Sequence, residues 1–181
     1  MDIKLKLGFV LILAPLILIT GCHLSPETSG IKSSISTAEG ITVGSTAPDF
    51  TLADLESETI TLSDLRGSPV MLNFWATWCD PCHNEMPFIQ EVYEKWQDSN
   101  LLILTINDKE DFSKVHQFMQ VNGLSFPVLL DADGNVFFKY EIRYVPTTFF
   151  IDKDGIVKGK RIGSFKNSAE IKNYLDLIIP Y

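Results

Sequence analysis

The stretch Pro69-Val-Met-Leu-Asn-Phe-Trp-Ala-Thr-Trp-Cys-Asp-Pro-Cys-His83 decides the fold and points to the chemistry. Its apolar first half, up to Trp75, predicts a buried strand, and a helical pattern begins directly after the two cysteines. Cys79 and Cys82 therefore stand where a strand meets a helix, so the unsatisfied N–H groups of the helix face the first sulfur. These groups favour thiolate over thiol. We expect Cys79 to attack disulfides and Cys82, one turn later, to resolve the mixed disulfide.

The N-terminus has the pattern of a secretory leader. Lys4 and Lys6 precede an apolar run, 7–19, that is shorter than the about 20 residues a membrane-spanning helix needs. The run ends in Ile19-Thr-Gly-Cys22, which resembles the lipobox of bacterial lipoprotein signal peptides. We expect cleavage before Cys22 and lipid on that cysteine, with an ordinary signal peptide or an uncleaved anchor as the alternatives. Each buried CH₂ adds about 0.8 kcal/mol, so two or three acyl chains would hold a domain at the membrane.

The number of cysteines and the net charge exclude several classes of function. With Cys22 assigned to lipid, one close pair remains of the three cysteines, which indicates chemistry rather than a disulfide scaffold. Removing the leader takes away two lysines and one aspartate, so the formal charge changes from −8 to −9. An acidic domain argues against nucleic acid as a partner and against electrostatic adhesion to anionic lipid. The acyl anchor would have to hold it at the membrane.

The order of the predicted elements indicates one α/β domain behind a tether. We interpret 1–21 as a signal peptide, 22–46 as the lipidated cysteine and a flexible Ser-, Thr- and Gly-rich tether, and 47–181 as the folded domain. The apolar patterns predict strands at 58–62, 69–76, 101–106, 126–130 and 147–151, a hairpin around 152–155, and helices at 80–97, 111–122 and 167–178. Strands that alternate with helices predict a covered, mostly buried sheet.

The chain resembles the thioredoxin-fold proteins of the ResA/TlpA group, which are membrane-tethered thiol–disulfide oxidoreductases. The resemblance spans about Ala47 to Ile178 and rests on an ordered set of motifs: Ala47-Pro-Asp-Phe50, Leu62-Ser-Asp-Leu-Arg-Gly67, Asn73-Phe-Trp-Ala-Thr-Trp-Cys-Asp-Pro-Cys82, Glu85-Met-Pro87 and Val145-Pro-Thr-Thr148. It implies a thioredoxin-like fold with a central mixed sheet, flanking helices and an N-terminal strand extension. It also implies a lipoprotein on the extracytoplasmic face of the bacterial cell membrane that needs no cofactor.

The resemblance implies roles for residues around the cysteine pair. Pro146 is expected to be cis beside the pair, which leaves the backbone of Val145 free to pair with an extended substrate. An ordinary proline at a strand entry is the alternative. Trp78 is expected to cover the disulfide and form part of the docking surface. Thr147 flanks Pro146 and either contributes to that surface or is a strand threonine without a role.

Two carboxylates are expected to act on Cys79. Glu110 fits the place of a glutamate that lies near the active cysteines in ResA-like proteins, where it would exchange protons during the reaction. Neighbouring aspartates crowd it, so a solvated helix start is the alternative. Asp80, which precedes Pro81 between the cysteines, adds a second negative charge. Ionised carboxylates raise the pKa of Cys79 and disfavour the reduced form, so the sequence leans towards a reductant.

The resemblance also implies partners. The substrates would be protein disulfides, and apocytochrome c is a plausible one, because its paired cysteines must be reduced before haem attachment in cytochrome c maturation. A membrane electron carrier of the CcdA/DsbD type would then reduce the oxidised cysteine pair again.

Four other interpretations use the same cysteines. Residues 79–83 also spell Cys-x-x-Cys-His, the attachment signature of c-type haem, but small cytochromes of that kind are mostly helical. A zinc site needs four ligands, and only His83 and His116 remain for it. A peroxiredoxin-like peroxidase shares the fold, but its peroxidatic cysteine follows a threonine where this chain has Ala76. A binding module that merely retained the cysteines is the fourth.

Overall fold

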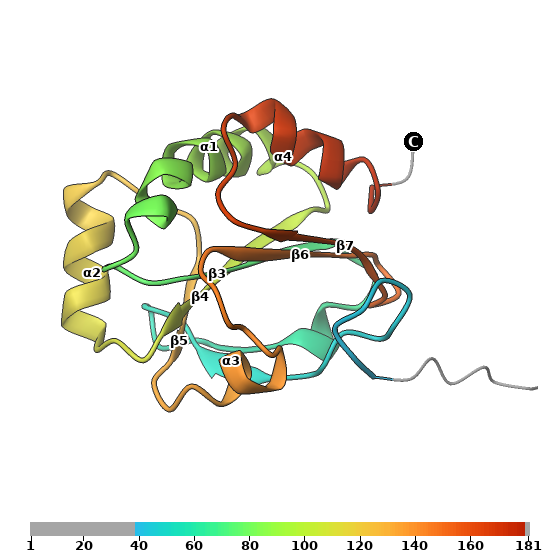
Figure 1. Cartoon of the computed structure of the whole chain (residues 1–181), viewed down its shortest axis with the longest axis horizontal. Helices are drawn as coiled ribbons and strands as arrows, with labels where there is room; N and C mark the ends of the chain where they lie inside the picture. The colour runs from blue at the N-terminus through green and yellow to red at the C-terminus, as the bar shows by residue number, and fades with distance from the viewer. Residues whose placement is uncertain (1–38, 180–181) are drawn as a thin grey trace, which may run out of the picture. The chain divides into compact units, whose positions relative to one another are not determined.

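The centre of the fold is strand β3, Val70–Trp75, in which all six side chains are buried. The computed structural model describes residues 39–179, and in this part of the chain β3 is the middle strand of a five-stranded sheet with the order β5-β4-β3-β6-β7 (Figure 1). Strand β3 pairs in parallel with β4 and antiparallel with β6. The mixed, covered sheet confirms the predicted α/β class and the thioredoxin-like arrangement.

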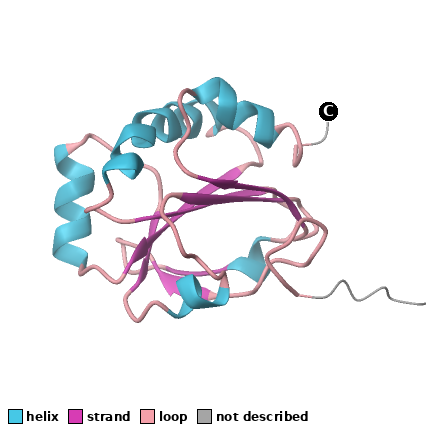
Figure 2. Cartoon of the chain, in the orientation of Figure 1, coloured by secondary structure: helices cyan, strands magenta, loops and turns pink. Residues whose placement is uncertain are grey.

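The described strands and helices follow one another in an order close to the predicted one (Figure 2). In chain order they are β1 Thr51–Ala53, β2 Thr59–Thr61, a 3₁₀ turn Leu62–Leu65, β3 Val70–Trp75, α1 Asp80–Trp96, β4 Leu102–Asp108, α2 Phe112–Val121, β5 Val128–Asp131, α3 Asn135–Lys139, β6 Thr147–Ile151, β7 Val157–Ile162 and α4 Ser168–Leu175. Strand β1 lies in the N-terminal extension that the resemblance implies, although no residue range was predicted for it, and helix α3 was not predicted, because five residues are too few to display a helical period.

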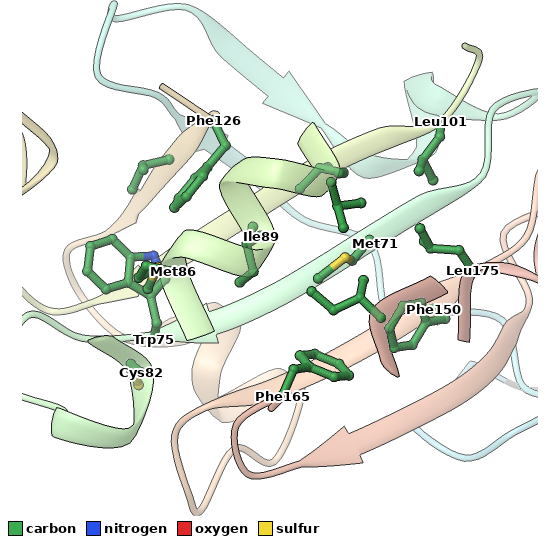
Figure 3. Close-up of a cluster of buried hydrophobic side chains, with 14 of the residues drawn as sticks. Met71, Trp75, Cys82, Met86, Ile89, Leu101, Phe126, Phe150, Phe165 and Leu175 are labelled. Carbon is green, nitrogen blue, oxygen red and sulfur yellow. The ribbon is translucent and has the colours of Figure 1, made fainter. Parts of the chain in front are cut away.

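The two faces of the sheet carry separate apolar clusters. Helices α1 and α4 cover one face, and α3 covers the other (Figure 1). Along β3, Met71 and Trp75 belong to the cluster under α1, whereas Leu72 and Phe74 belong to the opposite cluster. Because side chains alternate along a strand, Asn73 also points to the α1 side. Figure 3 shows part of the α1 cluster, which includes Trp75 and Cys82.

The packed part of the chain begins earlier than residue 47, the predicted start of the domain. The backbone N–H of Gly44 donates to the carbonyl of Val157 at 2.8 Å, and that of Gly40 donates to Thr46 at 2.9 Å. Residues 39–46 are therefore bonded to the domain, a correction to the C-terminal limit of the predicted tether. Backbone hydrogen bonds need no apolar pattern, so the polar sequence gave no sign of them.

The predicted signal peptide, Cys22 and most of the tether lie outside the described residues. Within residues 39–179, no helix is long and apolar enough to cross a membrane.

Candidate active site

The cysteine pair lies at the first turn of α1. Cys79 is the N-cap residue, and its Sγ accepts a hydrogen bond of 3.1 Å from the backbone N–H of Cys82. A disulfide with an S–S distance of 2.09 Å joins the two. Cys79 is 4% exposed whereas Cys82 is fully buried, so the small exposed area of the pair belongs to the predicted nucleophile. Pro81 fits the first helical turn, where a missing N–H costs no hydrogen bond.

The Val145–Pro146 peptide bond is cis, as the resemblance implies. Strand β6 begins at the next residue, and its register with β3 brings this bond to the end of the sheet from which the chain leads to the cysteines. Val145 packs against the apolar cluster that contains both cysteines. Among residues 39–179, no backbone bond outside the helices and strands uses its N–H or C=O.

Two residues that were predicted for the docking surface differ in exposure. Trp78 is 62% exposed, as a residue that meets a partner must be. Thr147 is buried, and its hydroxyl donates to the carbonyl of Tyr144 at 2.7 Å. Of the two alternatives for Thr147, the burial favours a threonine of strand β6 over a contribution to the docking surface, and its hydroxyl bonds to the turn that precedes Pro146. Asp80 lies exposed in the first turn of α1.

Glu110 holds the loop that leads to Cys79. Its carboxylate accepts hydrogen bonds from the N–H and the hydroxyl of Thr77, both at 2.6 Å, and from the amide of Asn107 at 2.8 Å. The ammonium of Lys114 lies 2.6 Å away. Burial raises the pKa of Glu110, but the hydrogen bonds from Lys114, Thr77 and Asn107 together outweigh burial and lower it.

The predicted proton exchange by Glu110 therefore has little support in the geometry. A carboxylate with four donors and a lowered pKa stays ionised and has few lone pairs left for a thiol proton. The alternative of a solvated helix start is wrong as well, since Glu110 is only 8% exposed. Glu110 acts on Cys79 through Thr77, two residues before it in the chain.

Glu85 is the titratable carboxyl that sequence analysis left without a role. It lies three residues after Cys82, on the same side of α1, and is fully buried. Its Oε1 accepts from the amide of Asn73 at 2.9 Å, and its Oε2 from the backbone N–H of Phe165 at 3.0 Å. Burial raises the pKa of Glu85 to about 7, although these two bonds and the charge of Arg161 lower it. A carboxyl that titrates near neutrality can take the proton that a resolving thiol must lose.

A sequence signal for Glu85 did exist. The buried stripe of α1 passes through Cys82, Met86 and Ile89, which are spaced at four and three residues. Glu85 lies on that stripe, as a charged residue among apolar ones. Applying the helical period to the charged residues, and not only to the apolar ones, would have marked it as a buried carboxyl.

Comparisons with known proteins agree with this geometry. A family model described as the AhpC/TSA family matches residues 43–160. The chain belongs to the AhpC/TSA family. Within the family it is similar to the thiol-disulfide oxidoreductase ResA of Geobacillus thermodenitrificans, at 44% identity over 140 residues, which cover 77% of this chain and 80% of the relative. It is also similar to ResA of Bacillus subtilis, at 41% identity over 142 residues, covering 78% and 79%.

Solved structures carry the same fold. StoA from Bacillus subtilis has a TM-score of 0.63 and 28% identity, covering 70% of this chain and 96% of that one. A thiol:disulfide interchange protein of the thioredoxin family from Chlorobium tepidum has a TM-score of 0.65 and 27% identity, covering 73% and 94%. This AhpC/TSA-family chain is therefore an enzyme, a thiol–disulfide oxidoreductase of the ResA type that acts on protein thiols.

The remaining interpretations of the cysteines gain no support from the site. The Nε2 atom of His83, the histidine of the haem-like signature, lies 2.7 Å from the carbonyl oxygen of Thr77. Within residues 39–179, no group of three or more His, Cys, Asp and Glu side chains is placed to hold a metal ion. The position where a peroxidase would carry threonine is Ala76, which is fully buried.

Proposed function

We propose that this oxidoreductase is a lipid-anchored, extracytoplasmic reductase of protein disulfides. The observation that carries the direction is Glu85, a buried carboxyl one turn from Cys82 with a pKa raised to about 7. Near this pH the site gains a negative charge, which disfavours thiolates and so weakens the reduced form of the pair. A dithiol with a weakened reduced form passes its electrons on readily.

The reaction follows from the two sulfurs and the carboxyl. The Cys79 thiolate attacks a substrate disulfide and releases one substrate thiolate, which leaves a mixed disulfide. Cys82 gives its proton to Glu85 and attacks the Cys79 sulfur, so the second substrate thiolate leaves and the Cys79–Cys82 disulfide forms. Two electrons pass to the substrate in this reaction. During the exchange, the backbone of Val145 binds the extended chain of the substrate. A membrane dithiol carrier of the CcdA/DsbD type would return two electrons to the pair.

The anchoring and the substrate rest on the sequence and on the family. The apolar run that ends in Ile19-Thr-Gly-Cys22 supports a lipid on Cys22 and a place on the extracytoplasmic face of the membrane. Apocytochrome c is the substrate that we propose, with a part in cytochrome c maturation, because its two haem cysteines form a disulfide of the kind that this pair reduces.

The direction is tested by the reduction potential of the Cys79–Cys82 pair, equilibrated against dithiothreitol and glutathione. We expect a value below about −230 mV, closer to the about −270 mV of thioredoxin than to the about −120 mV of strong oxidants. A potential near the oxidant value would overturn the reductase. The anchor is tested separately with Cys22→Ser, which should release the domain or leave its leader uncleaved. A processed, membrane-bound variant would refute lipidation.

A further inference from the structure

Asn73 of β3 joins Glu85 to strand β6. Its Nδ2 lies 2.9 Å from Glu85 Oε1 and 2.9 Å from the hydroxyl oxygen of Thr148, so one amide nitrogen serves both neighbours. The other end of the same amide, Oδ1, is buried without a hydrogen-bond partner. Buried polar atoms without a partner are rare and destabilise the fold, so the unpartnered Oδ1 of Asn73 requires a physical explanation.

The reason lies in the two protonation states of Glu85. When Glu85 is ionised, an amide nitrogen is the correct neighbour, because a carboxylate only accepts hydrogen bonds. When Glu85 carries a proton, its O–H needs an acceptor, but the two groups that face its oxygens, the Asn73 amide nitrogen and the Phe165 N–H, are both donors. A half-turn of the amide exchanges nitrogen and oxygen. Oδ1 then accepts from the Glu85 O–H and from the Thr148 hydroxyl, which can donate as well as accept.

We propose that Asn73 is a positioning residue whose amide turns as Glu85 gains or loses its proton, so that a carboxyl can titrate inside the core. Asn73 does not touch the sulfurs and acts through Glu85. One proton moves between the Cys82 thiol and the Glu85 carboxyl, and no electron passes through Asn73. When the amide turns, the Thr148 hydroxyl changes from acceptor to donor, so the protonation state of Glu85 also affects Thr148, two residues beyond Pro146. This role rests on thiol–disulfide exchange and not on the membrane anchor or the direction of the reaction.

In the part of the chain that the structure describes, few charges act on Glu85. From β7, Arg161 is the cation that acts on it, and Nη2 of that arginine lies 3.9 Å from Glu170 of α4. Strands β3 and β6 contribute the neutral side chains of Asn73 and Thr148, and the loop before α4 contributes a backbone N–H. The cysteines of α1 do not titrate while they form the disulfide. The oxidised protein therefore isolates the titration of Glu85.

Asn107 provides a matched control. It is also a fully buried asparagine of the sheet with an unpartnered Oδ1, but its amide donates to Glu110 and not to Glu85. The experiment follows the ¹³C signal of the Glu85 carboxyl by NMR in the oxidised full chain, with Glu85→Gln to assign the signal. Asn73→Ala should raise the pKa of Glu85 by about one unit or more, because the ionised form loses a donor. Asn107→Ala should leave it unchanged.

Two further measurements keep the proposal falsifiable. In the wild type, the side-chain amide signals of Asn73 should shift with the midpoint of Glu85, whereas those of Asn107 should not. If Asn73→Ala does not fold, Asn73→Asp keeps the size, and two carboxyls in contact share one proton with a raised apparent pKa. The positioning role of Asn73 would be overturned if the pKa of Glu85 were unchanged in folded Asn73 variants. It would also be overturned if the Asn73 amide signals did not shift during the titration of Glu85. Because the oxidised protein needs no substrate, failure of the reductase proposal would leave these results untouched.

Discussion

Glu85 and Glu110 are both buried glutamates, and each accepts a hydrogen bond from a buried asparagine of the sheet, Asn73 for the first and Asn107 for the second. They differ in what else surrounds the carboxylate. Glu110 has a lysine at 2.6 Å and two further donors from Thr77. Within residues 39–179, Glu85 has one backbone N–H besides its asparagine, and the charge of Arg161 acts on it without a hydrogen bond.

The difference decides the charge state of each group. Burial disfavours the ionised form of both, and the number of donors decides whether burial prevails. For Glu110 the donors prevail, its pKa falls, and an ionised carboxylate holds the loop before Cys79. For Glu85 burial prevails, and its pKa rises to about 7. Burial and an asparagine partner therefore do not by themselves identify a proton-exchanging group, whereas a count of the donors does.

The largest expected effect is on the exchange rate of Glu85→Gln. Removing a general base costs about 10²-fold or more, because Cys82 must then lose its proton to water. We would measure single-turnover reduction of a disulfide peptide by the prereduced enzyme between pH 5 and 9. The wild-type profile should bend near pH 7, and the variant should lack that bend. Glu110→Gln is the matched control and should keep it. If both variants lost the bend and the same fraction of the exchange rate, the assignment of proton exchange to Glu85 and not to Glu110 would be wrong.

The second prediction concerns stability and pH. The pKa of Glu85 is about 7 in the folded protein, above its ordinary 4.5, so between these values the native state binds more protons than the unfolded state. The free energy of unfolding therefore falls as pH rises through this window, by roughly 3 kcal/mol in total. Glu85→Gln should lack this loss. Denaturant unfolding of the oxidised wild type and of oxidised Glu85→Gln at pH 5 and pH 8 measures this loss. If the free energy of unfolding changed with pH equally in both proteins, Glu85 would not be the group that titrates.

The sequence was sufficient for the fold because the strands and most helices have strong periods. The apolar run before Cys79 and the alternation of elements predict β3, α1 and a covered sheet, and the resemblance supplied the mixed sheet and the cis bond at Pro146. Helix α3 and the backbone pairing of residues 39–46 were not predicted from the sequence. Hydrogen bonds between main chains leave no trace in side-chain patterns.

The site was predicted less completely than the fold. A carboxylate near the cysteines was expected at Glu110, and the structure gives that glutamate a loop-holding role. The number of donors around a carboxylate depends on residues distant in the chain, such as Thr77 for Glu110 and Phe165 for Glu85. Sequence spacing does not show such contacts. For the same reason, the sequence left open whether Thr147 contributes to the docking surface or is a strand threonine, and its hydrogen bond to Tyr144 favours the second.

The third prediction concerns the loop held by Glu110. Glu110→Gln should lower the free energy of unfolding by about 2 kcal/mol, since donors that faced the carboxylate lose an acceptor and the new NH₂ group meets another donor. Because the folded pKa of Glu110 is lowered, its contribution is present above the unfolded value of 4.5 and is lost as pH falls through the folded pKa. Hydrogen exchange of the Thr77 amide should quicken in the variant. Lys114→Met, which removes a half-exposed partner, should cost less than about 1 kcal/mol. Unchanged protection at Thr77 would refute the loop-holding role.

The smallest expected effect belongs to Asp80, whose charge is exposed in the first turn of α1. Asp80→Asn should lower the pKa of the Cys79 thiol and make the pair more oxidising, because a negative charge beside the sulfur is lost. One pKa unit fully expressed in the reduced state equals about 30 mV, and solvent around an exposed carboxylate keeps the shift below that. The shift should shrink further in 1 M salt, where the screening length is about 3 Å, whereas the effect of the buried Glu85 should persist. Thiolate absorbance and equilibration with dithiothreitol at low and high salt measure both quantities. No shift at low salt would remove Asp80 from the electrostatic case for a reductase and leave Glu85 alone to support it.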